Sequence, residues 1–380
     1  MNSSTRVAAR SWLTAFSIVL CCASLAHAAI PPERLRAPPG FRIELLTDAV
    51  PNARAMTLGR YADGKGIVYV GSMGEGKVYA VEIDQGKSRG VHTLLSGLAL
   101  PAGVAYRGGR LYVSAVSKIV RLDAIDDRLQ NPPLPVLVTD RLPSETHHGA
   151  KFIGFGPDGL LYVGVGAPCN VCVPSAAHGQ ILRMKPDGSE PQVVARGVRN
   201  TVGFDWSPLD QSLWFTDNGR DMLGDDLPSD ELNHATQTGQ EFGFPYCHQG
   251  DLPDPEFGVR RHCDEFAAPA AKLGAHVASL GMRFYGGSQF PAEYRGSIFI
   301  AEHGSWNRSR KVGYQVARAA LDAQGRVLRV EPFVQGWLQV DGAGRETVLG
   351  RPADVLVLPD GSLLISDDFG GAIYRVHYAP

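Results

Sequence analysis

Two histidines and a lysine stand together in the stretch THHGAKF, as His147, His148 and Lys151, directly before a glycine-rich run of strand-forming residues. A strand with a purely structural purpose needs no such cluster at its start. A neutral histidine accepts a proton from a hydroxyl group, and a lysine beside it attracts an anion. These residue types and this spacing predict proton transfer next to an anionic ligand.

Further polar groups stand before other apolar runs of the chain. Arg199 and Asn200 precede the run VGFDW, and Arg351 precedes PADVLVL. Arginine side chains pair with carboxylates through two parallel hydrogen bonds, so several of them in one place suit an anionic ligand. For any one of these residues alone, the alternative is a satisfied structural hydrogen bond.

An acidic segment, GDDLPSDE, covers residues 224–231. Calcium prefers oxygen ligands, and carboxylates are frequent among them. The segment is therefore a candidate structural calcium site through Asp230 or Glu231, and a solvated loop is the alternative interpretation.

Four cysteines follow residue 28. Cys247 and Cys263 flank a polar stretch with little apolar surface to order it, which predicts a disulfide across that loop. Cys169 and Cys172 form a C-x-x-C pattern without the strand and helix context of a thioredoxin motif. For this second pair a local structural disulfide, a redox role and a metal site stay open.

A repeated unit must position these groups. Each copy has a glycine or polar turn, a short apolar β run, a small or polar stretch, and usually a second β run. The copies recur at intervals of roughly 40 to 50 residues, longer in the last two, which is typical of propeller blades. Their first β runs are GIVYVGS (66–72), GRLYVSA (109–115), GLLYVGVG (159–166), QSLWFTD (211–217), GSIFIAE (296–302) and GSLLISD (361–367).

Six such units predict an all-β protein with one six-bladed β-propeller over residues 29–380. The early run FRIELLT (41–47) is expected to complete the last blade and close the ring. The inner strand of each blade runs along the central channel, so the residues just before these strands are expected to meet at one mouth. A two-domain β sandwich is the alternative fold.

The first 28 residues have the pattern of a cleaved secretory signal peptide. Arg6 and Arg10 precede an apolar run that ends at Ala26–Ala28. Removal of this leader takes the net charge from −2 to −4, because the leader contains two arginines and no acidic residue. That balance indicates no binding of nucleic acid, and no later run is long enough to span a membrane. A periplasmic or secreted location is expected.

Several long motifs resemble one family. RNTVGFDW, LWFTDNGRDMLGDDLPSDELN, AEHGSWNRSRKVGY and HHGAKF are similar to segments of the glucose/sorbosone dehydrogenases, closer to the sorbosone-dehydrogenase-like branch. The resemblance covers about residues 40–378. It implies an exported six-bladed propeller that uses pyrroloquinoline quinone (PQQ) and calcium.

The resemblance also implies roles for individual residues. The family's histidine base matches His147, and a register shifted by one residue places it on His148. The arginine–asparagine pair that contacts the quinone matches Arg199 and Asn200, and a further cofactor arginine matches Arg351. The family holds calcium by two consecutive backbone carbonyls, which correspond here to Gly219 and Arg220.

Three positions depart from the family pattern. A lysine that contacts PQQ is absent, and the segment AEHGSWNR offers His303 or Arg308 in its place. A second arginine near Arg351 is replaced by Ala353 or is shifted in the sequence. The carboxylate that partners the histidine in the soluble glucose enzymes has no counterpart in GVGAPCN.

The leading functional prediction is a PQQ-dependent dehydrogenase that oxidises a sugar or aldose-like hydroxyl, or a hydrated aldehyde, and passes electrons to a separate acceptor. The first alternative is a calcium-dependent lactonase or esterase, whose metal would be held by side-chain oxygens in the channel. The second is a propeller without catalytic activity that binds a protein or a polysaccharide.

Overall fold

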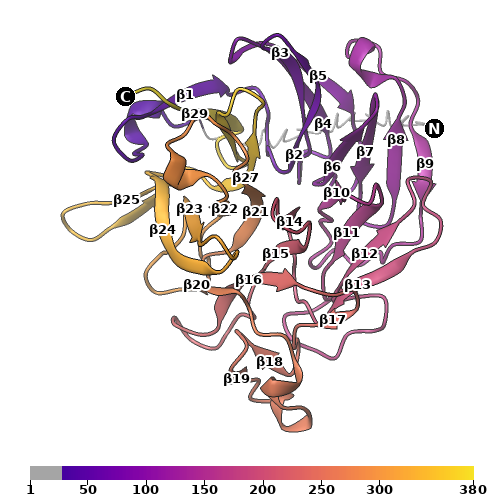
Figure 1. Cartoon of the computed structure of the whole chain (residues 1–380), viewed down its shortest axis with the longest axis vertical. Coiled ribbons are helices and arrows are strands. Elements are labelled where there is room, and N and C mark those ends of the chain that lie inside the picture. The colour runs from indigo at the N-terminus through magenta and orange to yellow at the C-terminus, as the bar shows by residue number, and fades with distance from the viewer. Residues whose placement is uncertain (1–27) are drawn as a thin grey trace, which may run out of the picture.

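The computed structural model describes residues 28–380. The predicted leader, apart from its last residue, lies outside the described residues. The described chain folds into six sheets arranged around a central axis (Figure 1), with only short 3-10 turns as helical structure. The predicted six-bladed β-propeller is confirmed.

Each of the first three blades is a four-stranded antiparallel meander, counted from the axis outwards. Blade 1 contains β2 (Met56–Ala62), β3 (Lys65–Val70), β4 (Val78–Asp84) and β5 (Lys87–Leu95). Blade 2 contains β6 (Val104–Arg107), β7 (Arg110–Ser114), β8 (Ile119–Leu122) and β9 (Val136–Thr139). Blade 3 contains β10 (Ile153–Phe155), β11 (Leu161–Val165), β12 (Gln180–Met184) and β13 (Gln192–Arg196), with β17 (Gln240–Glu241) paired to its outer edge.

The other three blades carry the insertions. Blade 4 contains β14 (Gly203–Trp206), β15 (Leu213–Asp217), β16 (Ser229–Ala235) and β20 (Ala271–Ala275). Blade 5 contains β21 (Ser279–Phe284), β22 (Ile298–Glu302), β23 (Gln315–Leu321) and β24 (Val327–Gln335). Blade 6 contains β27 (Pro352–Val357), β28 (Leu363–Asp367), β29 (Ala372–Tyr378) and β1 (Phe41–Thr47).

Short elements make up the connections. Two small hairpins pair β18 (Cys247–His248) with β19 (Leu252–Pro253), and β25 (Leu338–Val340) with β26 (Glu346–Val348). The 3-10 turns are η1 (Pro32–Arg34), η2 (Ile125–Asp127), η3 (Gly258–Arg260), η4 (Cys263–Glu265) and η5 (Ala292–Tyr294).

The second strand of a blade lies between two other strands and is apolar for that reason. β11 reads LYVGV and β22 reads IFIAE, and every residue of both strands is buried. One apolar cluster connects blades 1 to 4 and includes Tyr69 and Phe204. Another connects blades 5 and 6 around Phe299 and Trp337. The site segments are therefore mounted on strands with little freedom to move.

The ring is closed by pairing of the first strand with the last. β1 pairs antiparallel with β29, from Phe41 opposite Tyr378 to Thr47 opposite Ile373. The run FRIELLT thus completes blade 6, as predicted. This pairing of an early strand with the last strand closes the ring, so that no open junction lies between the first and last blades.

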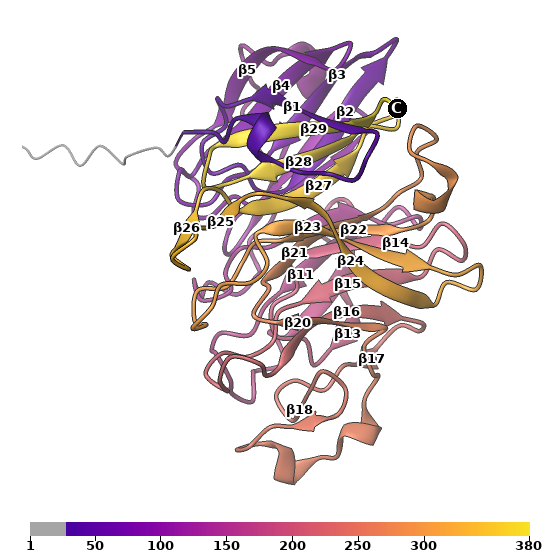
Figure 2. The same ribbon diagram turned by 90° about the vertical axis from the view of Figure 1, so that its left-hand side faces the viewer.

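The predicted disulfide between Cys247 and Cys263 is present, and Cys169 and Cys172, whose role the sequence left open, are also joined by a disulfide. The first disulfide crosslinks the insertion that carries β18 and β19. This insertion projects from the rim of the ring in two perpendicular views (Figures 1 and 2). The second lies in the loop after β11, close to the candidate site.

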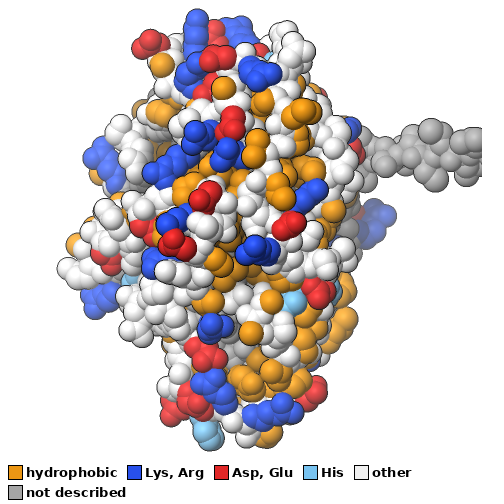
Figure 3. Space-filling model, turned by 90° about the vertical axis from the view of Figure 1, so that its right-hand side faces the viewer, with side chains coloured by type: hydrophobic (Ala, Val, Ile, Leu, Met, Phe, Trp, Pro, Cys, Tyr) orange, Lys and Arg blue, Asp and Glu red, His pale blue; other side chains and the backbone are white. Residues whose placement is uncertain are grey.

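Basic and acidic side chains are interspersed on the face shown in Figure 3, with apolar side chains visible between them. This mixture is in keeping with the near-neutral net charge of the chain. In residues 28–380, no helix has the length and apolar character needed to cross a membrane.

Candidate active site

The segments that precede the inner strands converge in the channel. A void of about 10 Å³ is lined by residues of five blades, all within two residues of the start of an inner strand: Arg54, Ala55, Ala102, Phe152, Val202, Ala353 and Asp354. Lys151, Asn200 and Arg351 lie within two residues of this lining in the sequence. The fold therefore brings together segments that are far apart along the chain.

His148 is held by its backbone and by one ring nitrogen. Its backbone is left-handed (φ 49°), in a turn in which the N–H of Gly149 donates to the carbonyl of Thr146 at 3.0 Å. Nδ1 lies 2.8 Å from the carbonyl oxygen of Ala167. A carbonyl only accepts, so Nδ1 carries the proton and Nε2 is left as a hydrogen-bond acceptor.

The surroundings of His148 keep its ring neutral. Burial lowers the pKa of His148 to about 3, and the positive charge of Arg199 and the ring of His147 add to the shift. His148 and Asn200 both pack closely against the backbone of Gly166. A Cβ at this position would lie 2.5 Å from Cβ of His148 and 3.3 Å from Oδ1 of Asn200. His148 is therefore a neutral imidazole beside the amide of Asn200, and no group in residues 28–380 forms a hydrogen bond with its Nε2.

His147 and Lys151 differ in exposure from His148. His147 is exposed, and its ring centroid lies 4.1 Å from that of His148. Lys151 is buried, and its Nζ donates to the carbonyl of Gly149 at 3.0 Å. Burial lowers the pKa of Lys151 to about 8. The lysine thus supports the turn that presents His148.

Arg199 is buried, and its guanidinium makes four hydrogen bonds within the described residues, which leaves one of its five N–H groups for a ligand. Nε donates to the carbonyl of Asn170 at 2.8 Å, and Nη2 donates to Oδ1 of the same residue at 2.9 Å. Nη2 also pairs with Asp221 at 2.9 Å, and Nη1 donates to the carbonyl of Asn218 at 3.2 Å. Within residues 28–380, the side-chain amide of Asn200 makes no hydrogen bond, so it is available to a ligand.

Aspartates at the ends of second strands orient these segments. Asp217, the last residue of β15, accepts the backbone N–H groups of Arg199 at 2.7 Å and Asn200 at 2.6 Å. Asp367, the last residue of β28, accepts the N–H of Arg351 at 2.9 Å. Burial raises the pKa of Asp217 to about 7, although the backbone N–H donors oppose this shift. In blades 4 and 6 alike, an aspartate at the end of the second strand accepts the backbone N–H of the arginine that precedes the inner strand.

Asp230 and Glu231 have partners within the protein. The two oxygens of Asp230 accept the backbone N–H groups of Gly219 and Ser279, each at 2.9 Å. Glu231 accepts the N–H of Gln249 at 2.6 Å and the amide of Asn233 at 2.9 Å. These carboxylates hold loops in place, and in residues 28–380 no group of three His, Cys, Asp or Glu side chains has metal-binding geometry.

Gly219 and Arg220 follow β15 at the channel. Their carbonyl oxygens accept no hydrogen bond from the described part of the chain, whereas the carbonyls of Asn218 and Asp221 on either side do. The side chain of Arg220 turns away to pair with buried Asp254. Two adjacent free carbonyls are the kind of ligand that calcium accepts.

A second polar cluster joins blades 1, 5 and 6. His303 Nε2 lies 2.8 Å from Oδ1 of Asp368, and Arg54 Nη1 lies 2.7 Å from Oδ2. Burial lowers the pKa of His303 to about 4, and Asp368 opposes the shift. The sequence prediction included His303 but missed Arg54 and Asp368.

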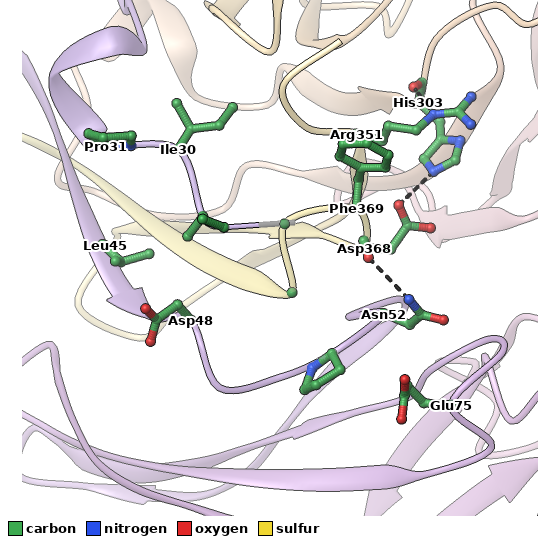
Figure 4. Close-up of a pocket in the computed structure, with 15 residues that line it drawn as sticks. Ile30, Pro31, Leu45, Asp48, Asn52, Glu75, His303, Arg351, Asp368 and Phe369 are labelled. Carbon is green, nitrogen blue, oxygen red and sulfur yellow. Dashed lines mark hydrogen bonds and ion pairs between the residues drawn. The ribbon is translucent and has the colours of Figure 1, made fainter. Parts of the chain in front are cut away.

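Arg351 has no carboxylate partner within the described residues. Its guanidinium donates to the backbone carbonyls of His303 at 3.1 Å and Gly304 at 2.6 Å, and lies over the ring of Tyr314. Arg351, His303 and Asp368 line a pocket of about 730 Å³, shown in Figure 4. Residues Ala28–Pro31 form its opposite wall. The pocket has the size of a small-molecule site, and its lining combines the guanidinium of Arg351 with the carboxylates of Asp48, Glu75 and Asp368.

Arg308 is not brought into this pocket. It pairs with Asp226 at 3.0 Å and donates to the carbonyl of Asp225, which ties its loop to the acidic segment 224–231. Of the two residues predicted for the missing lysine position, His303 is therefore the one that lines the pocket.

The fold and the polar groups of the channel together define a class of protein. A closed six-bladed propeller presents a neutral histidine, an open amide and arginines at one end of its channel, which is the arrangement of a propeller enzyme that binds an anionic small molecule. Residues 114–375 match the family model described as Glucose / Sorbosone dehydrogenase. The chain belongs to the glucose/sorbosone dehydrogenase family, a PQQ-dependent family, and is a sugar oxidoreductase in general terms.

Individual proteins are similar to this chain over most of its length. A protein of Borreliella burgdorferi, described only as uncharacterized, is 34% identical over 357 residues, which cover 90% of this chain and 91% of that one. The holo form of the pyranose dehydrogenase PQQ domain from Coprinopsis cinerea is 18% identical, has a TM-score of 0.77, and covers 92% of this chain and 98% of its own. The soluble aldose sugar dehydrogenase of Escherichia coli in its apo form is 19% identical with a TM-score of 0.64, over 89% and 99%.

Proposed function

We propose that the mature protein is an exported PQQ-dependent dehydrogenase that oxidises a sugar or aldose-like hydroxyl, or a hydrated aldehyde. The observation that carries this proposal is the guanidinium of Arg351, which has no acidic partner within the described residues and lines a pocket of about 730 Å³. An anion with carboxylates suits such a group, because each carboxylate accepts paired hydrogen bonds from a guanidinium. Membership of a PQQ-dependent family supports PQQ as that anion.

Residues of this chain suit the remaining parts of the cofactor site. Arg351 and His303 are proposed to bind the cofactor on one side, with Arg199 and Asn200 on the other. Gly166, with no side chain, allows His148 and Asn200 to pack against its backbone side by side, and the two side chains are proposed to face the same ligand. When bound, PQQ supplies the acceptor for the hydride that leaves the substrate carbon.

His148 is proposed as the general base in preference to His147. Its Nδ1–H donation to Ala167 directs an unprotonated Nε2 outward, which is the atom that accepts the substrate proton. The carbonyl of Ala167 takes the orienting position that a carboxylate occupies in the soluble glucose enzymes. An anion that pairs with Arg199 weakens the repulsion on the imidazolium and so raises the basicity of His148.

Calcium is proposed to bind the free carbonyls of Gly219 and Arg220 together with the cofactor. This position would place a divalent cation next to cofactor oxygens and favour negative charge that develops there. Asp230 holds this loop through its hydrogen bond from the N–H of Gly219, and Glu231 accepts the N–H of Gln249 in the insertion that carries β18 and β19. Neither carboxylate is proposed as a ligand.

The location is proposed to be periplasmic or secreted, with cleavage after Ala28. The leader pattern of the sequence and the two disulfides support this proposal. N-terminal sequencing of the exported protein tests it: a mature protein that begins at Ala29 is expected, and recovery of intact leader would contradict it.

The decisive experiment reconstitutes purified apo-protein with PQQ and calcium and follows dye reduction across a panel of sugars. Activity that requires both additions is expected, with loss on chelation and recovery on return of calcium. A parallel assay of lactone hydrolysis addresses the calcium-dependent hydrolase. Hydrolysis without any dye reduction would refute the dehydrogenase, and the absence of both activities would favour a binding propeller.

A further inference from the structure

The loop after β11 contacts both halves of the candidate site. Ala167 accepts the Nδ1–H of His148 at 2.8 Å, and its own N–H donates to the carbonyl of Arg199 at 2.7 Å. A single residue of this loop therefore fixes the ring of the proposed base and the backbone of the proposed cofactor arginine. Any shift of the loop moves both groups together.

Three residues further along, Asn170 binds the guanidinium itself. Its backbone carbonyl accepts Nε–H of Arg199 at 2.8 Å, and its Oδ1 accepts Nη2–H at 2.9 Å. The same Oδ1 accepts the N–H of Asp221 at 2.8 Å, and Nδ2 donates to the carbonyl of Asp221 at 3.1 Å. Asn170 thus connects the loop after β11 to the loop that carries the free carbonyls of Gly219 and Arg220.

The disulfide between Cys169 and Cys172 encloses Asn170. It closes a loop with a sequence separation of 3, against 16 for Cys247 and Cys263. In the chain-entropy account, the stabilisation of the whole fold is smallest for the shortest loop. A bridge of this kind changes global stability little, and it restricts the two residues that it encloses. One of these two residues is Asn170, which accepts two hydrogen bonds from the guanidinium of Arg199.

We propose that the Cys169–Cys172 disulfide is a positioning device for the site, which holds Asn170 so that the Arg199 guanidinium and the His148 ring keep their orientation. The proposal rests on the cofactor role proposed for Arg199 and on the base role proposed for His148. It assigns the C-x-x-C pair to positioning, without any change in its redox state during turnover.

The first test compares variants by their affinity for PQQ. Cys169→Ser combined with Cys172→Ser removes the bridge, Asn170→Ala removes the side-chain contacts, and Val173→Ser changes an exposed side chain directly after the loop. Titration of PQQ in the presence of calcium, followed by quinone absorbance, is expected to show a dissociation constant raised at least tenfold in the first two proteins and unchanged in the third. Melting temperatures are expected to stay within a few degrees of the parent. Unchanged affinity with a large fall in melting temperature would assign the bridge to global stability and overturn the proposal.

A second readout does not depend on PQQ. Nuclear magnetic resonance of the Arg199 Nε–H group in the apo-protein reports whether its hydrogen bond to Asn170 persists, through its rate of exchange with water. Dithiothreitol reduces the half-exposed bridge of the folded parent by exchange, giving two cysteine thiols and the cyclic disulfide of the reagent. We expect slow exchange before reduction and exchange at least tenfold faster after it, with the same change in the double serine variant.

The two readouts separate failure of this inference from failure of the proposed function. If the parent binds no PQQ, the cofactor proposal is wrong, and the Arg199 exchange rate still decides whether the bridge positions the guanidinium. If the parent binds PQQ and neither affinity nor exchange responds to loss of the bridge, the positioning inference is wrong and the function stands.

Discussion

Two adjacent histidines receive different environments from one turn of backbone. The left-handed conformation at His148 and the glycine after it rotate one ring inward, where the carbonyl of Ala167 takes its Nδ1–H. His147 is left at the surface. Identical side chains therefore differ in burial, orientation and access to a ligand.

This difference leads to a prediction for turnover. His148→Ala is expected to lower kcat by ~10²-fold or more at saturating PQQ, which is the usual scale for loss of a positioned general base. The affinity for PQQ is expected to change little, because the arginines remain. Steady-state dye reduction gives the first quantity and quinone titration the second.

His147→Ala serves as the matched control, since it removes the same side chain from an exposed position. We expect less than a threefold change in kcat. A dead His147 variant beside an active His148 variant would restore the family register in which His147 is the base.

Glu302 gives a prediction for stability against pH. It is buried at the end of β22, and within residues 28–380 its carboxyl group accepts one side-chain hydrogen bond, from Nε2 of Gln315 at 2.7 Å. Burial raises the pKa of Glu302 to about 8, whereas an unfolded glutamate titrates near ~4.3. The native state therefore retains a proton that the unfolded state has lost, so stability is present at low pH and falls as pH rises from roughly 4 to 8.

Glu302→Gln is expected to make this fall less steep, because an amide does not ionise. Urea denaturation at pH 5 and pH 8.5 measures the difference in the free energy of unfolding for each protein. Equal slopes for parent and variant would show that Glu302 does not carry the retained proton.

At the scale of elements, the strands could be predicted from the sequence and the geometry of the loops could not. The runs around Tyr69, Tyr112 and Leu364 predicted the blades because a middle strand is apolar on both faces. The repeat also predicted that the segments carrying Arg199 and Arg351 precede inner strands at the same end of the channel. Arg54 was not among the predicted residues, although it precedes the first inner strand as Arg351 precedes the last. This shared position is the sequence signal that identifies it.

Other parts of the site depend on contacts that no periodicity encodes. Asp368 follows the end of β28 and acquires its role only because Arg54 and His303 reach it from two other blades. The choice between His147 and His148 depends on one backbone turn. The acidic segment suggested a metal site, whereas the folded chain supplies Asp230 with two backbone N–H donors.

The two disulfides are expected to differ in their contribution to the fold. Replacement of Cys247 and Cys263 by serine is predicted to lower the free energy of unfolding by ~3 kcal/mol, because the bridge closes the longer loop. The matching replacement of Cys169 and Cys172 is predicted to lower it less. Urea denaturation of both variants measures this order, and the reverse order would contradict the chain-entropy argument.

At the scale of the whole molecule, one aromatic side chain secures the closure of the ring. Phe41 on β1 lies with its ring centroid 4.8 Å from that of Phe290 and 5.0 Å from that of Phe333, both in blade 5. It also lies 5.1 Å from Tyr378, its partner residue on β29. The closing strand therefore contacts the neighbouring blade as well as its own.

Phe41→Ala is expected to lower the free energy of unfolding by ~3 kcal/mol, within the range for loss of a large aromatic contact. Because the strand closes the ring, a single cooperative transition at lower temperature is expected, measured by calorimetry. Arg42→Ala, on the exposed face of the same strand, is the control and is expected to leave the melting temperature unchanged. A separate early transition in the Phe41 variant would show that the blades unfold independently.

The narrow void behind the site has a kinetic consequence. At about 10 Å³ it accommodates at most about one water molecule, so among the described residues this void gives a sugar no passage. For the proposed dehydrogenase, sugar, oxidised product and electron acceptor must then use the same opening in turn. We expect ping-pong kinetics, with parallel lines in double-reciprocal plots and mutual competition between sugar and acceptor at high concentrations. Intersecting lines would mean that both bind at once, and hence that the acceptor has a separate approach to the cofactor.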